Sequence, residues 1–379
     1  MPVTVRSFAK INLGLRIGSA REDGFHELLT VYQTIGLHDL IRVAVERGTG
    51  IEIQCADPRV PRDESNTCFR IAAKAMTALR AKGRVVIEIE KRLPVQGGMG
   101  GASSNAVATL LGLERALRKA LSAAEKLKIA AEVGSDLPLF LVGGTVLGVG
   151  RGEQVYPLSE LPTLACVVVT PEVGVSTPKA FAEWDRVQGQ KPVSLEGPDA
   201  ARSTSSGHAL KGRSSTVGQA AEFSPRENAG ELRSLGQPGA AVPTQAKPKL
   251  TVADASDRMN LLGRGLSAWL SGLYSGAPSG LRRGGRAENP LLWLVRAGIE
   301  NDFERVVFPE YPELSEGKGA LLRAGAKYAS LSGSGSTLYG LFASREAAGR
   351  AAGRLRKQGW AVRATATLTR RAYWKRVVG

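Results

Sequence analysis

One segment restricts the fold of this chain more than any other: a glycine-rich loop that joins a strand-like segment to a helix-like one. Residues 84–91 alternate apolar and charged side chains, which predicts a β-strand. Residues 94–104 then supply four glycines and two serines, and they lead into the apolar stretch 107–113. Glycine lets backbone N–H groups approach an anion, and the first N–H groups of a helix are unpaired. The segment therefore predicts a phosphate-binding loop at a helix start.

The loop differs from both common phosphate-binding signatures. It lacks the Gly-Lys-Ser/Thr ending of a Walker loop, and no acidic residue ends a second strand about 20 residues later, as a dinucleotide site requires. A flexible linker is the alternative, but linkers do not lie between a strand and an apolar helix in this way. We expect the hydroxyls of Ser103 and Ser104 to cap the helix, or to donate to phosphate oxygens or a metal-bound water.

Length and composition limit the class of protein. The 379 residues are enough for two domains, and strands and helices are mixed in both halves, which indicates an α+β fold. No apolar run is long enough for a bilayer and the N-terminus lacks a signal-peptide core, so we expect no membrane partner and a cytoplasmic location. Three scattered cysteines and three histidines predict neither a disulfide framework nor a zinc site.

The net charge of +16 raises the alternative of a nucleic-acid-binding protein. Residues 345–379 alone carry ten lysines and arginines against one glutamate. A basic surface attracts a polyanionic small substrate such as a nucleotide equally well. We therefore expect a small-molecule substrate and no nucleic-acid partner.

Patterning along the chain predicts the order of the elements. Strands are expected at 2–6, 40–45, 51–54, 84–91, 145–149, 164–169, 338–342 and 360–368. Helices are expected at 66–79, 103–117, 122–133, 176–184, 311–324 and 345–357. Asn66 should cap the first helix, Ser122 and Glu125 should form a capping box, and 46–50 resembles a hairpin turn.

The middle of the chain has a different composition. Residues 186–249 are rich in Gly, Ser, Pro, Gln and Ala, with few large apolar side chains. Such a segment cannot bury enough surface to offset its ordering entropy, which predicts a disordered insertion. His208 lies inside it, so we do not expect a site there. Two helices are expected after it, at 256–273 and 288–299.

Two charged residues outside the loop are candidates for chemistry. Lys10 lies in the run Ser7-Phe8-Ala9-Lys10-Ile11-Asn12-Leu13, and Asp136 lies between Gly134-Ser135 and an apolar run with a proline. Asp136 is either a helix cap or a poised catalytic group. Phosphoryl transfer needs a phosphate cradle, a positive charge and a carboxylate that orients or deprotonates the acceptor. The loop, Lys10 and Asp136 could supply these parts, and Lys10 close to Asp136 would keep that acid ionised.

The order of these motifs resembles the GHMP kinase superfamily. The superfamily has three motifs in the same order. In this chain they are the lysine motif around Lys10, the loop Pro94-x3-Gly98-x2-Gly101-x-Ser103-Ser104 and the late glycine cluster 332–336. The turn Asp23-Gly24-Phe25-His26 and the run Gly134-Ser135-Asp136-Leu137-Pro138 are similar to the branch that phosphorylates a cytidine-diphospho polyol. The resemblance covers about 1–184 and 288–379, including Gly150-Arg151-Gly152-Glu153 and Asn301-Asp302-Phe303-Glu304.

The resemblance implies a two-domain GHMP kinase fold. Residues 1–160 would form the N-terminal ATP-binding domain, similar to a ribosomal-protein domain. Residues 161–379 would form the C-terminal α/β sandwich domain, with the insertion 186–249 inside it. The implied activity is phosphorylation of the 2-hydroxyl of cytidine-diphospho-methylerythritol, in the non-mevalonate route to isopentenyl diphosphate. A monomer or weak homodimer is expected.

The resemblance also implies roles for residues. Lys10 and Asp136 would be the catalytic pair, with Asp136 as the base. The ATP phosphates would lie on Pro94, Val95, Gln96, Gly97, Gly98, Met99, Gly100, Gly101, Ala102, Ser103 and Ser104. The substrate would contact Asn12, Phe25, His26, Gly333 and Ser334, with Phe25 and His26 at the cytosine. Mg²⁺ would bridge the ATP phosphates largely through water, without a cage of protein ligands.

Three positions depart from the superfamily's pattern. Phe25 stands where a tyrosine is common, which keeps stacking and removes a hydroxyl. Gln96 and Ala102 replace glycines, so either would be strained at a positive φ. The alternatives are a homoserine- or mevalonate-type kinase, a basic RNA-binding protein of similar fold, and an inactive regulator. The last two leave Lys10 and Asp136 without a role.

Overall fold

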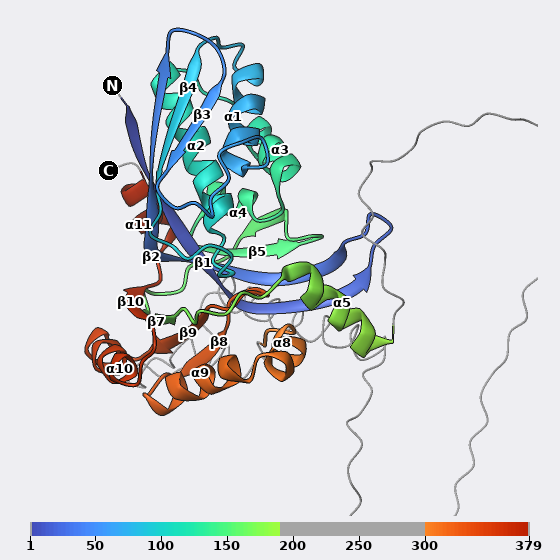
Figure 1. Cartoon of the computed structure of the whole chain (residues 1–379), viewed down its shortest axis with the longest axis vertical. Helices are drawn as coiled ribbons and strands as arrows, with labels where there is room; N and C mark the ends of the chain where they lie inside the picture. Colours follow the sequence, from blue (N-terminus) through green and yellow to red (C-terminus); the bar gives the residue numbers. More distant parts are fainter. Residues whose placement is uncertain (1, 190–299, 378–379) are drawn as a thin grey trace, which may run out of the picture. The chain divides into compact units, whose positions relative to one another are not determined.

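The computed structural model describes residues 2–189 and 300–377. Two β-sheets with helices packed against them make up this part of the chain, which is an α+β arrangement (Figure 1). The expected helices at 256–273 and 288–299 and the expected insertion, apart from its first residues, lie outside the described residues.

The first sheet contains six strands. They are β1 (Val3–Ala20), β2 (His26–Glu46), β3 (Ile51–Cys55), β4 (Arg84–Glu90), β5 (Thr145–Val149) and β6 (Gln154–Pro157). The order is β3-β4-β2-β5-β6, and β1 pairs with β2. The expected hairpin at 46–50 is wrong, because β3 does not pair with β2 and instead lies parallel to β4.

Strands β1 and β2 are far longer than the strands predicted at 2–6 and 40–45. Every residue of β1 from 7 to 18 is buried, including the polar residues Lys10, Asn12 and Arg16. Because both faces are covered, the alternation that marks a half-buried strand is lost. The pairing with β2 also shifts register three times, so no simple period runs through the strand.

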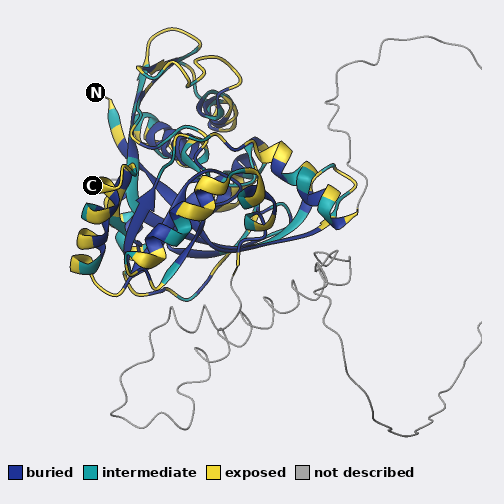
Figure 2. Ribbon diagram, turned by 60° about the horizontal axis from the view of Figure 1, so that its bottom comes forward, coloured by how far each residue is buried: buried dark blue, intermediate teal, exposed yellow. Residues whose placement is uncertain are grey.

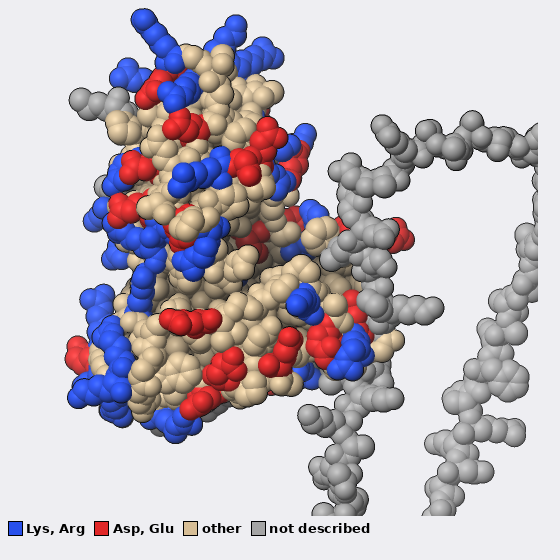
Figure 3. Space-filling view, viewed as in Figure 1, with Lys and Arg blue, Asp and Glu red and all other residues tan. Residues whose placement is uncertain are grey.

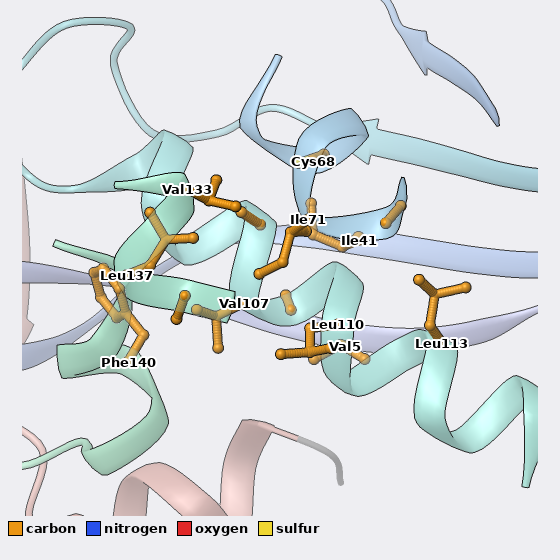
Figure 4. Packing of buried hydrophobic residues seen from close by; sticks show 14 of the residues in the cluster. Val5, Ile41, Cys68, Ile71, Val107, Leu110, Leu113, Val133, Leu137 and Phe140 are labelled. Carbon is orange, nitrogen blue, oxygen red and sulfur yellow. The ribbon is translucent and has the colours of Figure 1, made fainter. Parts of the chain in front are cut away.

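Four helices accompany this sheet: α1 (Thr67–Ala78), α2 (Gly101–Leu117), α3 (Ala123–Val133) and α4 (Leu137–Val142). Apolar side chains of α1, α2 and α4 interlock with those of the sheet (Figure 4). The predicted cap Asn66 accepts from the Cys68 N–H at 2.8 Å, and the Ser122–Glu125 capping box is present. The expected serine cap of α2 is wrong, since the cap residue is Gly100 at φ 66° and no side chain caps the helix.

The second sheet has four antiparallel strands in the order β10-β7-β9-β8. They are β7 (Ala165–Val169), β8 (Tyr328–Leu331), β9 (Leu338–Phe342) and β10 (Val362–Ala366). The accompanying helices are α5 (Thr177–Gln188), α8 (Glu304–Glu310), α9 (Pro312–Arg323) and α10 (Arg345–Lys357). Strands β7 and β9 are buried throughout, whereas the edge strand β10 has exposed residues, and the helices keep exposed outer faces (Figure 2).

One predicted helix is longer than expected, and helices α4, α8 and α11 (Arg370–Val377) were not predicted. Helix α5 continues to Gln188, four residues beyond the expected 176–184, so residues 186–188 belong to a helix. The basic C-terminal segment forms α11. The Tyr373 hydroxyl donates to the Phe140 carbonyl at 2.7 Å and the Trp374 indole N–H donates to the Val142 carbonyl at 3.0 Å, so α11 is fixed by contacts distant in sequence.

Candidate active site

Strand register brings the first polar residues of the site together. Lys10 and Asn12 are two residues apart on β1 and therefore point to the same face of the sheet. The Lys10 ammonium donates to Asn12 Oδ1 at 2.6 Å, and Asn12 Nδ2 donates to Thr30 Oγ1 of β2 at 2.8 Å. Only 3% of Lys10 is exposed. This ammonium is held in a buried, hydrogen-bonded position.

Asp136 lies at the start of α4 but does not cap that helix with its side chain. Its Oδ2 is 3.5 Å from Lys10 Nζ, and its Oδ1 accepts from the Tyr32 hydroxyl at 3.1 Å. Burial lowers the pKa of Lys10 from its ordinary value, and the Asp136 carboxylate opposes that shift. The structure thus brings together the two residues that the sequence proposed as a pair, and the alternative of a side-chain helix cap is wrong.

The glycine loop lies against this pair. The Lys10 backbone N–H donates to the Met99 carbonyl at 3.0 Å. Gly98 and Gly100 have φ values of 74° and 66°, which only glycine adopts readily. Gln96 shares this left-handed conformation at φ 58°, so the expected strain is confirmed there. At Ala102 the condition for strain is not met, because that residue lies in the right-handed helix α2.

A cavity of about 380 Å³ opens beside the loop. All ten residues from Pro94 to Ser103 line it, together with Arg59, Asn66, Thr67 and Lys91 among others. Ser104 faces the core instead: its hydroxyl donates to the Phe8 carbonyl at 2.7 Å and lies 2.6 Å from Ser7 Oγ. The Ser104 side chain therefore joins α2 to β1 and does not line this cavity.

A buried ion pair that sequence reasoning missed fixes the beginning of the loop. Asp39 of β2 accepts from the Lys91 ammonium at 2.7 Å and from the backbone N–H groups of Arg92 and Leu93 at 2.6 and 2.7 Å. Asp39 is fully buried. Nothing in its local sequence distinguishes it from a surface aspartate, since its partners are more than 50 residues away.

The late glycine motif approaches the same pair from the second sheet. A Cβ added at Gly333, whose φ is 61°, would lie 3.4 Å from Lys10 Nζ and 3.6 Å from Asn12 Oδ1. The Asn301 side-chain amide donates to the carbonyls of Leu331 and Gly333 at 2.9 and 2.8 Å. Ser334, in contrast, exchanges a hydrogen bond with Thr177 at 2.7 Å. Asn301 was noted only as part of a motif, and its supporting contacts were not foreseen.

Phe25 and His26 have different surroundings although they are neighbours. The Phe25 ring is 47% exposed, with the Arg151 guanidinium 4.7 Å from its centroid. His26 is buried, its Nε2 lies 2.6 Å from Asp185 Oδ1, and its ring stacks on Phe181 at 4.8 Å. Phe181 and Asp185 were not predicted. Phe25 is thus open to a ligand, whereas His26 is held by side chains of α5.

The surface charge and the possible metal ligands of the described residues bear on what this part of the chain could bind. On the face shown in Figure 3, lysines and arginines alternate with acidic residues over the upper part of the molecule. Among residues 2–189 and 300–377 no three His, Cys, Asp or Glu side chains gather into a group that could hold a metal ion. None of the helices in these ranges is long and apolar enough to cross a bilayer.

Two family models match separate parts of the chain. The model for the GHMP kinases N terminal domain matches residues 66–144, and the model for the GHMP kinases C terminal region matches residues 290–360. The first range contains the glycine loop and Asp136, and the second contains the late glycine motif. The fold and the site therefore define the class of the GHMP kinases.

Curated relatives narrow this class. A 4-diphosphocytidyl-2-C-methyl-D-erythritol kinase from Solibacter usitatus is 32% identical over 348 residues, which cover 92% of this chain and 83% of the relative. A relative of the same name from Moorella thermoacetica is 30% identical, over 94% of this chain and 95% of its own length. The chain belongs to the family of 4-diphosphocytidyl-2-C-methyl-D-erythritol kinases. The expected class, a small-molecule kinase, is confirmed.

Solved structures agree with this assignment. A crystal structure of 4-(cytidine 5'-diphospho)-2C-methyl-D-erythritol kinase aligns with a TM-score of 0.60 at 26% identity, over 96% of this chain and 99% of that one. A homoserine kinase from Cytophaga hutchinsonii aligns with a TM-score of 0.61 at 17% identity, over 97% and 95%, which shows a shared fold alone. The expected α+β GHMP kinase fold is confirmed, while the domain boundary at residue 160 stays a prediction.

Proposed function

We propose that the chain transfers the γ-phosphoryl group of ATP to the 2-hydroxyl of 4-diphosphocytidyl-2-C-methyl-D-erythritol. The observation that carries this proposal is the Lys10–Asp136 pair, 3.5 Å apart, with Lys10 bonded through its backbone to the glycine loop. The names of the relatives supply the substrate. The route to isopentenyl diphosphate follows as part of the same proposal.

In this mechanism Asp136 accepts the proton of the substrate hydroxyl while that oxygen bonds to the γ-phosphorus. The bond between this phosphorus and the bridging oxygen of ADP breaks, and ADP leaves. The Lys10 ammonium, close to Asp136, stabilises the negative charge on the transferred group. Asn12 holds the ammonium in place through its 2.6 Å hydrogen bond. The pair thus combines a base with a charge stabiliser.

The conformation of the glycine loop supports the proposed binding of the ATP phosphates. Gly98 and Gly100 adopt the left-handed conformation that the loop requires, and the first turn of α2 presents unpaired N–H groups. A Cβ at Gly101 would lie 3.4 Å from Lys91 Nζ, so a cation also borders this helix start. These features fit a polyphosphate. Mg²⁺, when bound together with ATP, would neutralise phosphate charge.

At the substrate end, the exposed Phe25 ring offers a stacking surface for cytosine. We expect His26→Ala to raise the substrate KM more than the ATP KM, because its ring is held by Asp185 and Phe181 of α5 and the residue adjoins the exposed Phe25 in sequence. Equal changes in both KM values would remove His26 from the cytosine site.

The test of the function is an ADP-release assay with Mg-ATP and the cytidine substrate, with homoserine and mevalonate as controls. Turnover with the cytidine substrate alone supports the proposal, and turnover only with a control substrate contradicts it. Asp136→Asn should retain ATP binding and lose roughly 10²–10⁴-fold in kcat, the usual contribution of a general base. Wild-type turnover in that variant would remove Asp136 as the base.

A further inference from the structure

The hydroxyl of Tyr32 is a buried polar group that the mechanism above does not use. It donates to Asp136 Oδ1 at 3.1 Å, while Lys10 Nζ lies 3.5 Å from Oδ2 of the same carboxylate. The two oxygens of the base therefore have different partners, one charged and one neutral. A hydrogen bond donated to a carboxylate favours its ionised form and fixes its orientation.

Close packing fixes the position of the Tyr32 ring. It comes from β2, is 2% exposed, and lies with its centroid 5.6 Å from Lys10 Nζ. A Cβ at Gly148 would overlap the ring edge, and a Cβ at Gly152 would overlap the hydroxyl oxygen. These two glycines leave a slot that the ring fills. The slot directs the hydroxyl toward Asp136.

The phenol also remains a donor across the working pH range. Burial raises the pKa of Tyr32 well above 10.0, and the Asp136 carboxylate and then Glu153 raise it further. The groups that face this contact are Lys10 from β1, Asp136 before α4 and Glu153 from the turn between β5 and β6. Arg151 lies 3.9 Å from Glu153 and partly offsets its charge.

We propose that Tyr32 is a positioning residue for the base: its hydroxyl holds the Asp136 carboxylate ionised and oriented between Tyr32 and Lys10. The inference deepens the proposed function, since it assumes that Asp136 accepts the substrate proton. A base must be ionised to act, so the tyrosine extends activity toward lower pH. It does so without adding a second charge next to the transferred phosphoryl group.

The first test is the pH profile of kcat for Tyr32→Phe, which keeps the ring and removes the hydroxyl. The acid limb should move to higher pH by roughly one unit, the size expected for losing a hydrogen bond to a charged group. The KM values for ATP and substrate should stay within about twofold. Tyr373→Phe is the matched control, because it removes a buried hydroxyl bonded to the Phe140 carbonyl, and its profile should match the wild type. Superimposable profiles for Tyr32→Phe and wild type would overturn the inference.

A second measurement does not depend on turnover. The ¹³C carboxyl signal of Asp136, assigned by its absence in Asp136→Asn, is titrated in the wild type and in Tyr32→Phe. The midpoint should be higher in Tyr32→Phe, and equal midpoints contradict the inference. If the wild type fails to phosphorylate the cytidine substrate, the proposed function fails while this titration still tests Tyr32.

A third variant covers the case in which Tyr32→Phe does not fold. Replacing Tyr32 with 3-fluorotyrosine strengthens the donor and keeps the ring, so the acid limb should move to lower pH. An unchanged limb would count against the inference.

Discussion

The two glycine motifs of this enzyme have similar composition but different surroundings. The loop 94–104 borders a cavity and contains three left-handed residues, Gln96, Gly98 and Gly100. The late motif at 332–336 is buried, and the Asn301 side chain and the Ser332 hydroxyl, which donates to the Gly98 carbonyl at 2.9 Å, tie it to its neighbours. Glycine permits close backbone packing in both motifs, at Gly98 and at Gly335, and the first motif also lines the cavity.

The two motifs also touch. A Cβ at Gly98 would overlap the Ser332 carbonyl oxygen and would lie 3.0 Å from the backbone of Gly335. The loop thus has one open side toward the cavity and one side supported by the second sheet. This difference predicts which glycine substitutions change ATP binding and which change the chemical step.

The largest effect is expected at the contact itself. Gly98→Ala would place a methyl group against the Ser332 carbonyl at a φ of 74°. We expect kcat/KM for ATP to fall by about 100-fold or more, since a 1 Å misplacement costs about that much. Gly174→Ala is the control, because no atom lies within 4 Å of its added Cβ. Near wild-type kinetics in Gly98→Ala would contradict the contact.

A smaller and different effect is expected in the late motif. Gly333→Ala adds a left-handed alanine, which costs about 1–2 kcal/mol, and places its Cβ near the Lys10 ammonium. We expect kcat to fall by roughly tenfold, with the ATP KM within about twofold, because the loop itself keeps its shape. An increase in the ATP KM equal to that of Gly98→Ala would remove the distinction between the motifs.

Gln96 and Ala102 replace glycines of the superfamily's loop, and restoring glycine at each should change the free energy of unfolding in opposite directions. Gln96→Gly relieves a left-handed glutamine and should raise the free energy of unfolding by about 0.5–1 kcal/mol. Ala102→Gly places glycine in the first turn of α2 and should lower it by about 0.5–1 kcal/mol. Urea denaturation of both variants measures the two changes. The same sign in both would show that backbone conformation does not control stability at these positions.

The smallest effect concerns the reactivity of two buried thiols, one beside the cavity and one in the second sheet. Burial raises the pKa of Cys68, beside the cavity, and of Cys166, in the second sheet, from 9.0 to about 12. Both should react with a disulfide reagent at near-neutral pH only after unfolding. The unfolded chain loses these protons first, so their contribution to stability is complete below pH 9.0 and declines as the pH rises toward 12. Rapid labelling of the native chain would contradict the burial.

Sequence reasoning predicted the parts of the site that depend on local pattern. Strand β4, the glycine loop and α2 follow one another in the sequence, and their periodicities are clear. It also proposed Lys10 and Asp136 as a pair, because phosphoryl transfer needs both charges. The assignment of the serines was less successful, since Ser104 turns toward the core.

The missed features depend on contacts between distant residues. Strand β1 hides its period because both faces are buried, and Asp39 and Asn301 look like ordinary polar residues until their partners are known. Tyr32 is one aromatic residue in an apolar run, and only the fold shows its hydroxyl at Asp136. Such roles require tertiary contacts that no local spacing encodes.

The length of β1 has a consequence for the order in which the enzyme becomes competent. Val5 and Phe8 of this strand belong to the core of the first sheet, while Leu15 and Ile17 belong to the core of the second. Lys10 lies between them and meets Gly333, more than 300 residues later. A chain emerging from the ribosome contains the residues that line the cavity early, but Lys10 and the glycine loop both lack the wall formed by residues 332–335 until that segment has been synthesised. The loop and the lysine therefore reach their final geometry together, late in the synthesis of the chain.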